Sequence, residues 1–189
     1  ACGSDSDDDY AYVRVLHASP DAPAVDVLVD GKAVLTNVQF QQGSGYLRVD
    51  EGARTLALRV SGTTGDPVLS GKFNLGKDNY YSVIAQNDVE ELELALLNDT
   101  ERRNNGSNDV TVVHASPDAP TVDIYVTAAD AESLGDVTVP GVSFGANATL
   151  EEIATGDYRV RITPTAATQP VSIAAAGPEV VYDSGTLTV

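Results

Sequence analysis

The chain has 189 residues, 28 of them acidic and 11 basic, for a formal net charge of −17 and an isoelectric point near 4.1. A surface of this sign repels phosphate backbones and anionic headgroups, so the composition argues against nucleic acid and against anionic membranes as partners. No apolar run approaches the roughly 18 residues that a membrane-spanning helix needs. Frequent Val, Thr, Ile and Tyr, punctuated by Gly and Pro, favour β-strands.

Residues 1–11 form a polar, acidic segment that we expect to be a solvated tether. It contains Cys2, the single cysteine of the sequence. Residues 1–4, Ala-Cys-Gly-Ser, resemble the end of a bacterial lipobox, in which the cysteine becomes the lipidated first residue of the mature protein. The resemblance implies a diacylglyceryl anchor on Cys2 and an extracytoplasmic location. The alternative is an unmodified cysteine near the N-terminus.

One stretch of the sequence occurs twice. Residues 13–27 and 110–124 share the heptad His-Ala-Ser-Pro-Asp-Ala-Pro, followed two residues later by Val-Asp, at a spacing of 97 residues (114 − 17, from His17 to His114). Seven identical residues in a chain of this length indicate duplication. We therefore predict a first domain over 12–98, a polar linker over 99–109 and a second domain over 110–189.

The first copy reads as a series of short strands separated by Gly-rich and Pro-rich breaks. The predicted strands are 12–18, 25–29, 46–49, 56–60, 68–75, 80–86 and 92–97. Alternation places His17 on the same side as the buried valines of its strand, and Asp26 on the exposed side of the next. A short helix within 89–97 is the alternative to the last strand.

Leu75, Asp78 and Tyr81 have the spacing of a tyrosine corner, in which a phenol bonds to upstream backbone at the edge of a β-sandwich. Tyr81 is the candidate. The predicted fold class is all-β, with two tandem immunoglobulin-like or prealbumin-like antiparallel β-sandwich domains.

The second copy departs from the first in two places. Where the first turns tightly at Asp30-Gly31, the second inserts residues 128–135. At the other end, residues 70–75 align with 184–189, so the second copy has no counterpart of 80–97. We expect either that the native chain continues or that the second domain has an open sheet edge that needs cover.

The paired motifs, supported by Asn37-Val38 ahead of Phe40 and by a Val/Ile-x-x-Gly pattern at 49–54 and 153–158, resemble the bacterial family called domain of unknown function 4397. The resemblance covers about residues 12–97 and 110–189. It implies β-sandwich domains, often in tandem and exported, in surface proteins and lipoproteins. It implies no catalytic residues, because the family has none assigned.

The repeated motif contains both histidines of the chain and supplies the candidate site residues, which are His17, Ser19, Asp21, Asp26, His114, Ser116, Asp118 and Asp123. One interpretation is a weak metal or proton-transfer site made by each histidine with its neighbouring acids. Two carboxylates and one histidine fall short of a closed zinc site, and polar residues at turns mostly bond to the turn itself. We therefore prefer a structural role and expect no catalytic residues, metal or cofactor.

The sequence contains no motif that supports nucleophilic catalysis, since Gly43-Ser44-Gly45 is shorter than the Gly-x-Ser-x-Gly elbow. We expect a non-enzymatic, lipid-anchored protein of the periplasm or cell surface that acts in binding, adhesion or spacing, with a protein or glycan ligand and membrane contact only through its lipid. One alternative is a carbohydrate- or peptidoglycan-binding module that uses tyrosine rings. A second is an unrecognised hydrolase, in which both histidines and nearby carboxylates converge in a cleft.

Overall fold

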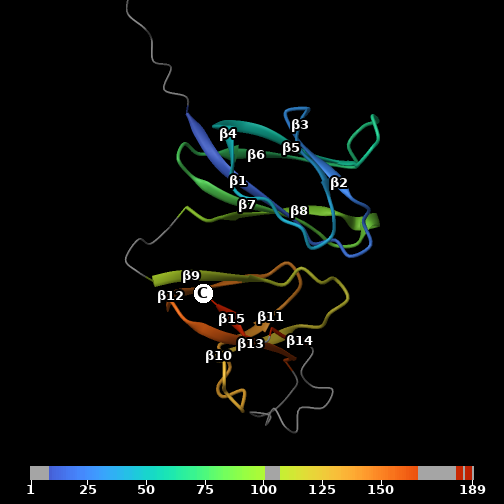
Figure 1. Ribbon diagram of the computed structural model, residues 1–189. Coiled ribbons are helices and arrows are strands. Elements are labelled where there is room, and N and C mark those ends of the chain that lie inside the picture. Colours follow the sequence, from blue (N-terminus) through green and yellow to red (C-terminus); the bar gives the residue numbers. More distant parts are fainter. Residues whose placement is uncertain (1–8, 101–106, 166–181, 185, 189) are drawn as a thin grey trace, which may run out of the picture. The chain divides into compact units, whose positions relative to one another are not determined.

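The computed structural model describes residues 9–100, 107–165, 182–184 and 186–188. Within these ranges the protein is all-β, apart from one 3-10 helix of three residues (η1, Val89–Glu91), so none of the described helices could span a membrane. The chain divides into two compact units, Ala1–Glu101 and Arg102–Val189. Each unit is a set of short strands (Figure 1), and each set encloses its own apolar cluster.

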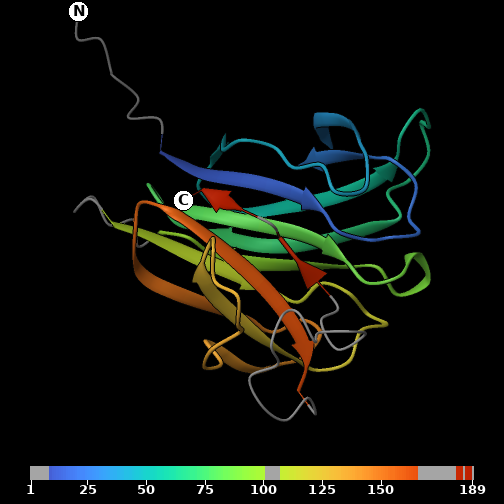
Figure 2. The ribbon, with the colours of Figure 1, turned by 60° about the horizontal axis from the view of Figure 1, so that its bottom comes forward.

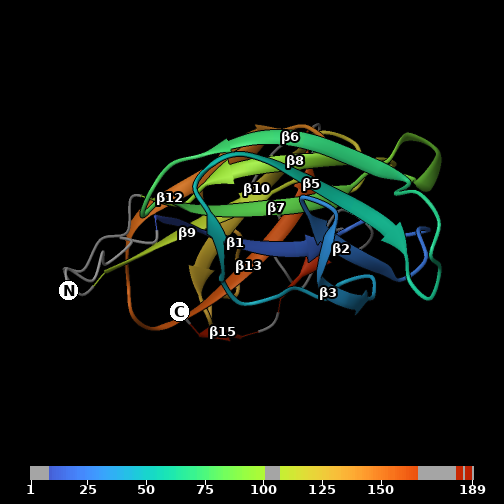
Figure 3. The ribbon, with the colours of Figure 1, turned by 90° about the horizontal axis from the view of Figure 1, so that it is seen from above.

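Unit 1 consists of two four-stranded sheets with the orders β4-β1-β7-β8 and β3-β2-β5-β6. Their strands are β1 (Tyr10–His17), β2 (Val25–Val29), β3 (Lys32–Val38), β4 (Leu47–Asp50), β5 (Gly52–Val60), β6 (Leu69–Leu75), β7 (Tyr80–Gln86) and β8 (Glu93–Asn98). Figure 3 shows β7 lying between β1 and β8 in the first sheet.

The core of unit 1 draws residues from both sheets. On β1, Val13 and Val15 are 2% and 4% exposed, whereas the intervening Arg14 and Leu16 are exposed. Leu56 and Leu58 of β5 belong to the same cluster from the other sheet. The period of two along β1 therefore buries one face of that sheet against the second sheet, as expected for a two-layer β-domain.

One pairing corrects the prediction of wholly antiparallel sheets. β1 runs parallel to β7, with partners from Tyr12–Tyr80 to His17–Ala85, while its other edge pairs antiparallel with β4. A hairpin can join only antiparallel strands, whereas β1 and β7 are separated by most of the unit. The direction of such a long-range pairing is invisible to the local patterns read from the sequence.

The strand predictions were otherwise close, with three corrections. β3 was not predicted, because six of its seven residues are at least partly exposed and the segment lacks a clear alternation. The segment 89–97 contains both alternatives in turn, first η1 and then β8. The prediction that Asp26 faces solvent was wrong: Asp26 is 6% exposed, and Leu28 and its cross-strand partner Ala57 are buried on the same face.

Unit 2 repeats the first six strands of unit 1. Its strands are β9 (Ser107–Val113), β10 (Val122–Ala128), β11 (Val139–Val142), β12 (Asn147–Ala154), β13 (Asp157–Pro164), β14 (Tyr182–Asp183) and β15 (Leu187–Thr188). The sheet β11-β10-β13-β14 matches β3-β2-β5-β6, and β14 and β15, the short red strands of Figure 2, both pair with β13. The pair β12-β9 matches β4-β1. Among the described residues, nothing corresponds to β7 and β8.

The predicted boundaries need small shifts. β1 begins at Tyr10, inside the predicted tether, and β9 begins at Ser107, inside the predicted linker. The linker's first residues also contact unit 1, because the N–H of Asp99 bonds to the Tyr80 carbonyl and the Thr100 hydroxyl accepts the Tyr80 N–H. Polar composition marked these residues as linker, but a strand end needs only backbone groups, which composition does not report.

The insertion 128–135 covers the outer face of the β10–β13 pair. Arg161 of β13 is fully buried and donates to the Ala131 carbonyl, and Leu134 is also fully buried. Tyr125, the cross-strand partner of Arg161, is 3% exposed although its register points away from the core. The insertion therefore covers the outer face of β10 and β13. In unit 1 the corresponding strands β2 and β3 are joined instead by the short turn at Asp30-Gly31.

Candidate functional site

The repeated turn, residues 17–23 in unit 1, is organised by the buried imidazole of His17. Nε2 lies 3.1 Å from the Pro23 carbonyl oxygen, and Nδ1 accepts the N–H of Ser19 at 3.3 Å. A carbonyl can only accept, so Nε2 carries the proton and Nδ1 does not. Both ring nitrogens are thus bonded to backbone of the same turn, which leaves neither a free lone pair for a metal nor a base for proton transfer.

The turn also fastens two other segments of unit 1. The backbone N–H of His17 bonds to the Gln42 carbonyl, and the His17 carbonyl accepts from Gln41, a residue with φ of +68°. The carboxylate of Asp21 accepts the N–H of Val89, the first residue of η1, at 2.8 Å. Ser19 is fully buried beneath this arrangement.

The second turn, residues 114–120, repeats the main contacts. His114 Nε2 lies 3.0 Å from the Pro120 carbonyl, and the backbone of His114 bonds to Ala146 and Gly145 as that of His17 bonds to Gln42 and Gln41. Each ring meets a phenylalanine edge-on at 6.4 Å, Phe40 in unit 1 and Phe144 in unit 2. Ser116 is exposed, whereas its counterpart Ser19 is buried, and Asp118 is exposed as Asp21 is.

Asp26 on β2 and Asp123 on β10 bond to the neighbouring strand and not to the repeated turn. Oδ1 of Asp26 accepts the N–H of Asn37 at 3.0 Å, and Oδ1 of Asp123 accepts the N–H of Gly141 at 2.8 Å. Asn37 and Gly141 have φ of +55° and +65° and lie where the pairing with the neighbouring strand shifts register. Each aspartate therefore holds a β-bulge in place. In unit 1, Arg59 completes the site as an ion pair at 3.4 Å.

The structure thus brings His17, Ser19 and Asp21 together in one turn but engages Asp26 with other partners. Among the residues described, no three His, Cys, Asp or Glu side chains gather as metal ligands would. The hydrolase hypothesis requires convergence of the imidazoles with carboxylates, and the bonding of each imidazole within its own turn lends it no support. Cys2, the predicted lipidation site, lies outside the described residues.

Tyr81 has the contacts of a tyrosine corner. Its hydroxyl oxygen accepts the N–H of Gly76 at 3.0 Å and lies 3.2 Å from the side-chain amide nitrogen of Asn79. The ring itself is buried in the core. The phenol therefore fastens the β6–β7 connection to the strand that follows it.

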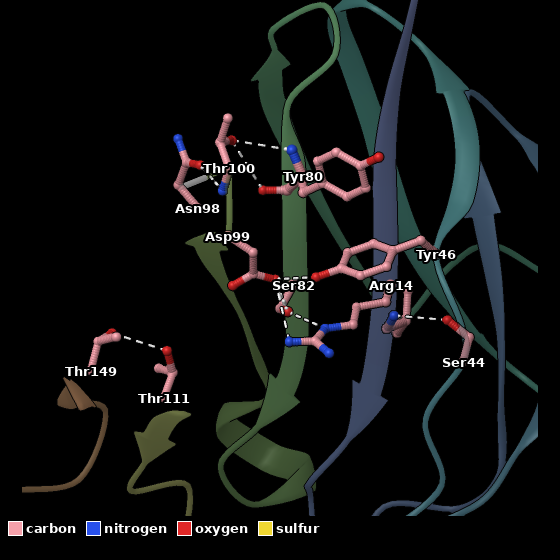
Figure 4. Close-up of polar contacts among 11 residues, drawn as sticks. Arg14, Ser44, Tyr46, Tyr80, Ser82, Asn98, Asp99, Thr100, Thr111 and Thr149 are labelled. Atoms are coloured by element: carbon pink, nitrogen blue, oxygen red, sulfur yellow. Dashed lines mark hydrogen bonds and ion pairs between the residues drawn. The ribbon is translucent and has the colours of Figure 1, made fainter. Parts of the chain in front are cut away.

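A feature that the sequence analysis missed is a tyrosine–arginine cluster on the outer face of the β4-β1-β7-β8 sheet. Its members are Tyr12, Arg14, Tyr46, Tyr80, Ser82 and Asp99, and Figure 4 labels all of them except Tyr12. The rings of Tyr12 and Tyr80 stack at 4.6 Å, and Tyr46 meets Tyr80 edge-on at 5.1 Å. The alternation of Tyr10, Tyr12 and Arg14 along one strand was the signal that could have revealed this face.

Asp99 is the polar centre of the cluster. Its Oδ2 accepts the hydroxyls of Tyr46, at 2.9 Å, and of Ser82, and lies 3.4 Å from the Arg14 guanidinium. Arg14 also donates to Ser82 and lies over the Tyr46 ring, 5.0 Å from its centroid. The cluster is thus a braced surface of half-buried rings and one partly exposed cation.

In the part of the chain that the structure describes, the cluster occurs in unit 1 only. At the offset of 97 residues, Asp109 and Thr111 replace Tyr12 and Arg14, and Thr111 forms a hydroxyl contact of 2.9 Å with Thr149 (Figure 4). The inward residues and the repeated turn are alike in both copies, whereas the outer face has changed. A face that differs between copies of one fold is where a copy-specific role can lie.

We predict that His17→Phe lowers the free energy of unfolding of unit 1 by roughly 2–4 kcal/mol, because it leaves the Ser19 N–H and the Pro23 carbonyl buried without a partner. His114→Phe is the matched control. It removes the bond to the Pro120 carbonyl, and the side chain at this position lines the cavity of unit 2, so we expect the free energy of unfolding to fall by only roughly 1–2 kcal/mol. Urea unfolding followed by amide hydrogen exchange in each unit measures both. Equal losses in the two units would contradict the asymmetry.

A second prediction concerns pH. The backbone N–H of Asn37, helped by the Ser61 hydroxyl and the Arg59 guanidinium, holds the pKa of Asp26 below its ordinary value. The ionised carboxylate therefore stabilises the fold above the ordinary Asp pKa of about 4, and this contribution is lost as the pH falls through the lowered value. Asp26→Asn keeps an acceptor for Asn37 but carries no charge. We expect its urea midpoint to fall less than that of the wild type between about pH 5 and pH 2; parallel curves would refute this.

Comparison with known proteins bears on the whole chain. No curated protein matches it. The family model described as "Domain of unknown function (DUF4397)" matches residues 11–125 and 108–186, which together span both units, in agreement with tandem copies. With the repeated turn present in each copy and the matches covering nearly all of the described strands, the chain belongs to the DUF4397 family.

Proposed function

We propose that the chain is a non-enzymatic, extracytoplasmic protein, anchored by a lipid on Cys2, that acts at the cell surface or in the periplasm as a binding, adhesion or spacer module. The observation that carries the proposal is the state of His17, whose two ring nitrogens are both bonded to backbone of its own turn. The histidine of the repeated heptad thus stabilises the fold of its own turn. A polar tether and a net charge of −17 for the whole chain fit a solvated surface location.

The finer fold assignment belongs to the same proposal. Two four-stranded sheets around one core, with the phenol of Tyr81 bonded to Gly76, support an immunoglobulin-like or prealbumin-like sandwich for unit 1. Such domains present ligands on sheet faces, edges and loops, while their cores carry packing.

Carbohydrate or peptidoglycan binding is a second candidate function, favoured by the tyrosine–arginine cluster. Sugar rings stack on aromatic faces, and their hydroxyls pair with charged and polar groups that flank the rings. Tyr12, Tyr46 and Tyr80 provide rings on a sheet face, and Arg14 and Asp99 provide a donor and an acceptor beside them.

We predict that protein isolated from its native cells carries a diacylglyceryl-sized mass increment on Cys2, and that Cys2→Ser moves the protein from the membrane to the soluble fraction. The physical reason is that acyl chains partition into the bilayer at about 0.8 kcal/mol per buried CH₂. Mass spectrometry of the N-terminal peptide together with membrane fractionation measures both. An unmodified cysteine on membrane-free protein would remove the anchoring part of the proposal.

For the carbohydrate alternative, we expect calorimetry to detect binding of cell-wall fragments. The association constant should fall about fivefold or more in Tyr12→Ala, because loss of one stacking ring costs on the order of 1 kcal/mol of binding free energy. Thr111→Ala, on the corresponding outer face of unit 2, is the matched control and should bind like the wild type. Silence of the wild-type protein across a panel of glycans and peptidoglycan fragments would dismiss this alternative.

A further inference from the structure

The first strand of each unit has a different number of neighbours. In unit 1, β1 pairs with β4 on one edge and with β7 on the other. In unit 2, β9 pairs with β12 on the corresponding edge, and across the described ranges no strand lies against its second edge. Both strands end in the same repeated motif, so the neighbours of β1 in unit 1 serve as the template for the second edge of β9.

The backbone donors of β9 are oriented as those of β1 are. In unit 1 the N–H groups of Tyr12 and Ala18 bond to carbonyls of Asn79 and Ala85 on the β7 side, whereas His17 bonds to Gln42 on the opposite side. In unit 2, His114 likewise bonds to Ala146 on the β12 side. Because successive N–H groups of a strand alternate in direction, those of Thr111 and Val113 face the second edge, as Arg14 and Leu16 do in unit 1.

An apolar cavity of about 300 Å³ lies beside the same edge. Among its lining residues are Val112, Ala119, Val122, Ile124 and Ile162. An apolar cavity of roughly 150 Å³ is known to hold a benzene ring, so this one has room for about two side chains.

In unit 1 the counterparts of these lining residues belong to a core that β7 completes. Val15, Val27 and Leu58 share that core with Val83 and Ala85 of β7, which are 2% and 1% exposed. Unit 2 lacks those two side chains among its described residues, and Val112, the counterpart of Val15, is only partly buried. The cavity therefore occupies the place that the inward residues of a β7-like strand fill in the first copy.

We propose that the second edge of β9 and the adjoining cavity bind an extended segment of another polypeptide, which runs parallel to β9 and inserts branched or small apolar side chains at alternate positions, as Val83 and Ala85 do in unit 1. Main-chain hydrogen bonds to β9 supply affinity, and the cavity selects the side chains. The β7 strand of a second copy of this chain is not the donor, since it is paired on both edges by β1 and β8. The inference rests on the proposed binding role and names its partner class.

The test uses the full chain carrying Cys2→Ser and a fluorescein-labelled peptide of residues 79–86, the β7 sequence. Fluorescence anisotropy should show saturable binding that a scrambled peptide does not share. Val113→Pro removes one N–H that faces the second edge and should weaken binding by about tenfold or more. Thr149→Ala, on β12 at the opposite edge of β9, is the control and should bind within about threefold of the wild type.

A second variant guards against misfolding of Val113→Pro. Ala119→Phe places a ring in the cavity and should weaken the affinity for the peptide by about tenfold or more. The amide NMR signals of β10 and β13 should stay unchanged, which shows that the variant is folded. Absence of peptide binding to the wild type, or equal binding by all three variants, would overturn the proposal, as would a dimer of the chain that Val113→Pro dissociates. Lipidation of Cys2 is read separately by mass spectrometry, so failure here leaves the anchoring result untouched.

Discussion

A buried imidazole bonded at both ring nitrogens to its own turn is the interaction on which unit 1 depends. His17 joins the end of β1 to the Pro-rich turn, and its backbone joins the same point to residues 41–42. The ring of His17 is only 1% exposed. Burial of this polar ring is tolerated because hydrogen bonds within the protein replace its hydrogen bonds to water. Both copies keep the bond from the imidazole to the carbonyl of the last proline of the turn.

The comparison of the two copies separates what holds the fold from what can vary on it. The imidazole–carbonyl bond, the edge-on phenylalanine and the aspartate that holds the bulge occur in both units. The outer face and the strands beyond β6 do not: among the described residues, the tyrosine–arginine cluster occurs in unit 1 only, and β7 and β8 have no counterpart in unit 2. The variable parts are surface and edge, which are the places where β-domains meet ligands.

These differences give the two units complementary roles in the proposed function. Unit 1 has a closed core and a polar, aromatic face braced around Asp99. Unit 2 has a smaller apolar cluster and a cavity beside the second edge of β9. Under the proposed function, recognition of partners rests on shape and backbone pairing, while the histidines and the bulge aspartates hold the fold.

The sequence by itself determined the duplication, the all-β class, most strands of unit 1 and the contacts expected of His17 and Tyr81, because each of these follows from an exact repeat or from a local spacing. It misjudged Asp26 and missed β3 and the tyrosine–arginine cluster. Burial of Asp26 needs Asn37 and Arg59, and the cluster joins residues from β1, β7 and the segment after β8. The tertiary structure alone decided the parallel pairing of β1 with β7 and the cavity beside β9. Both depend on which strands meet across long stretches of chain, and local periodicity carries no information about partners so far apart.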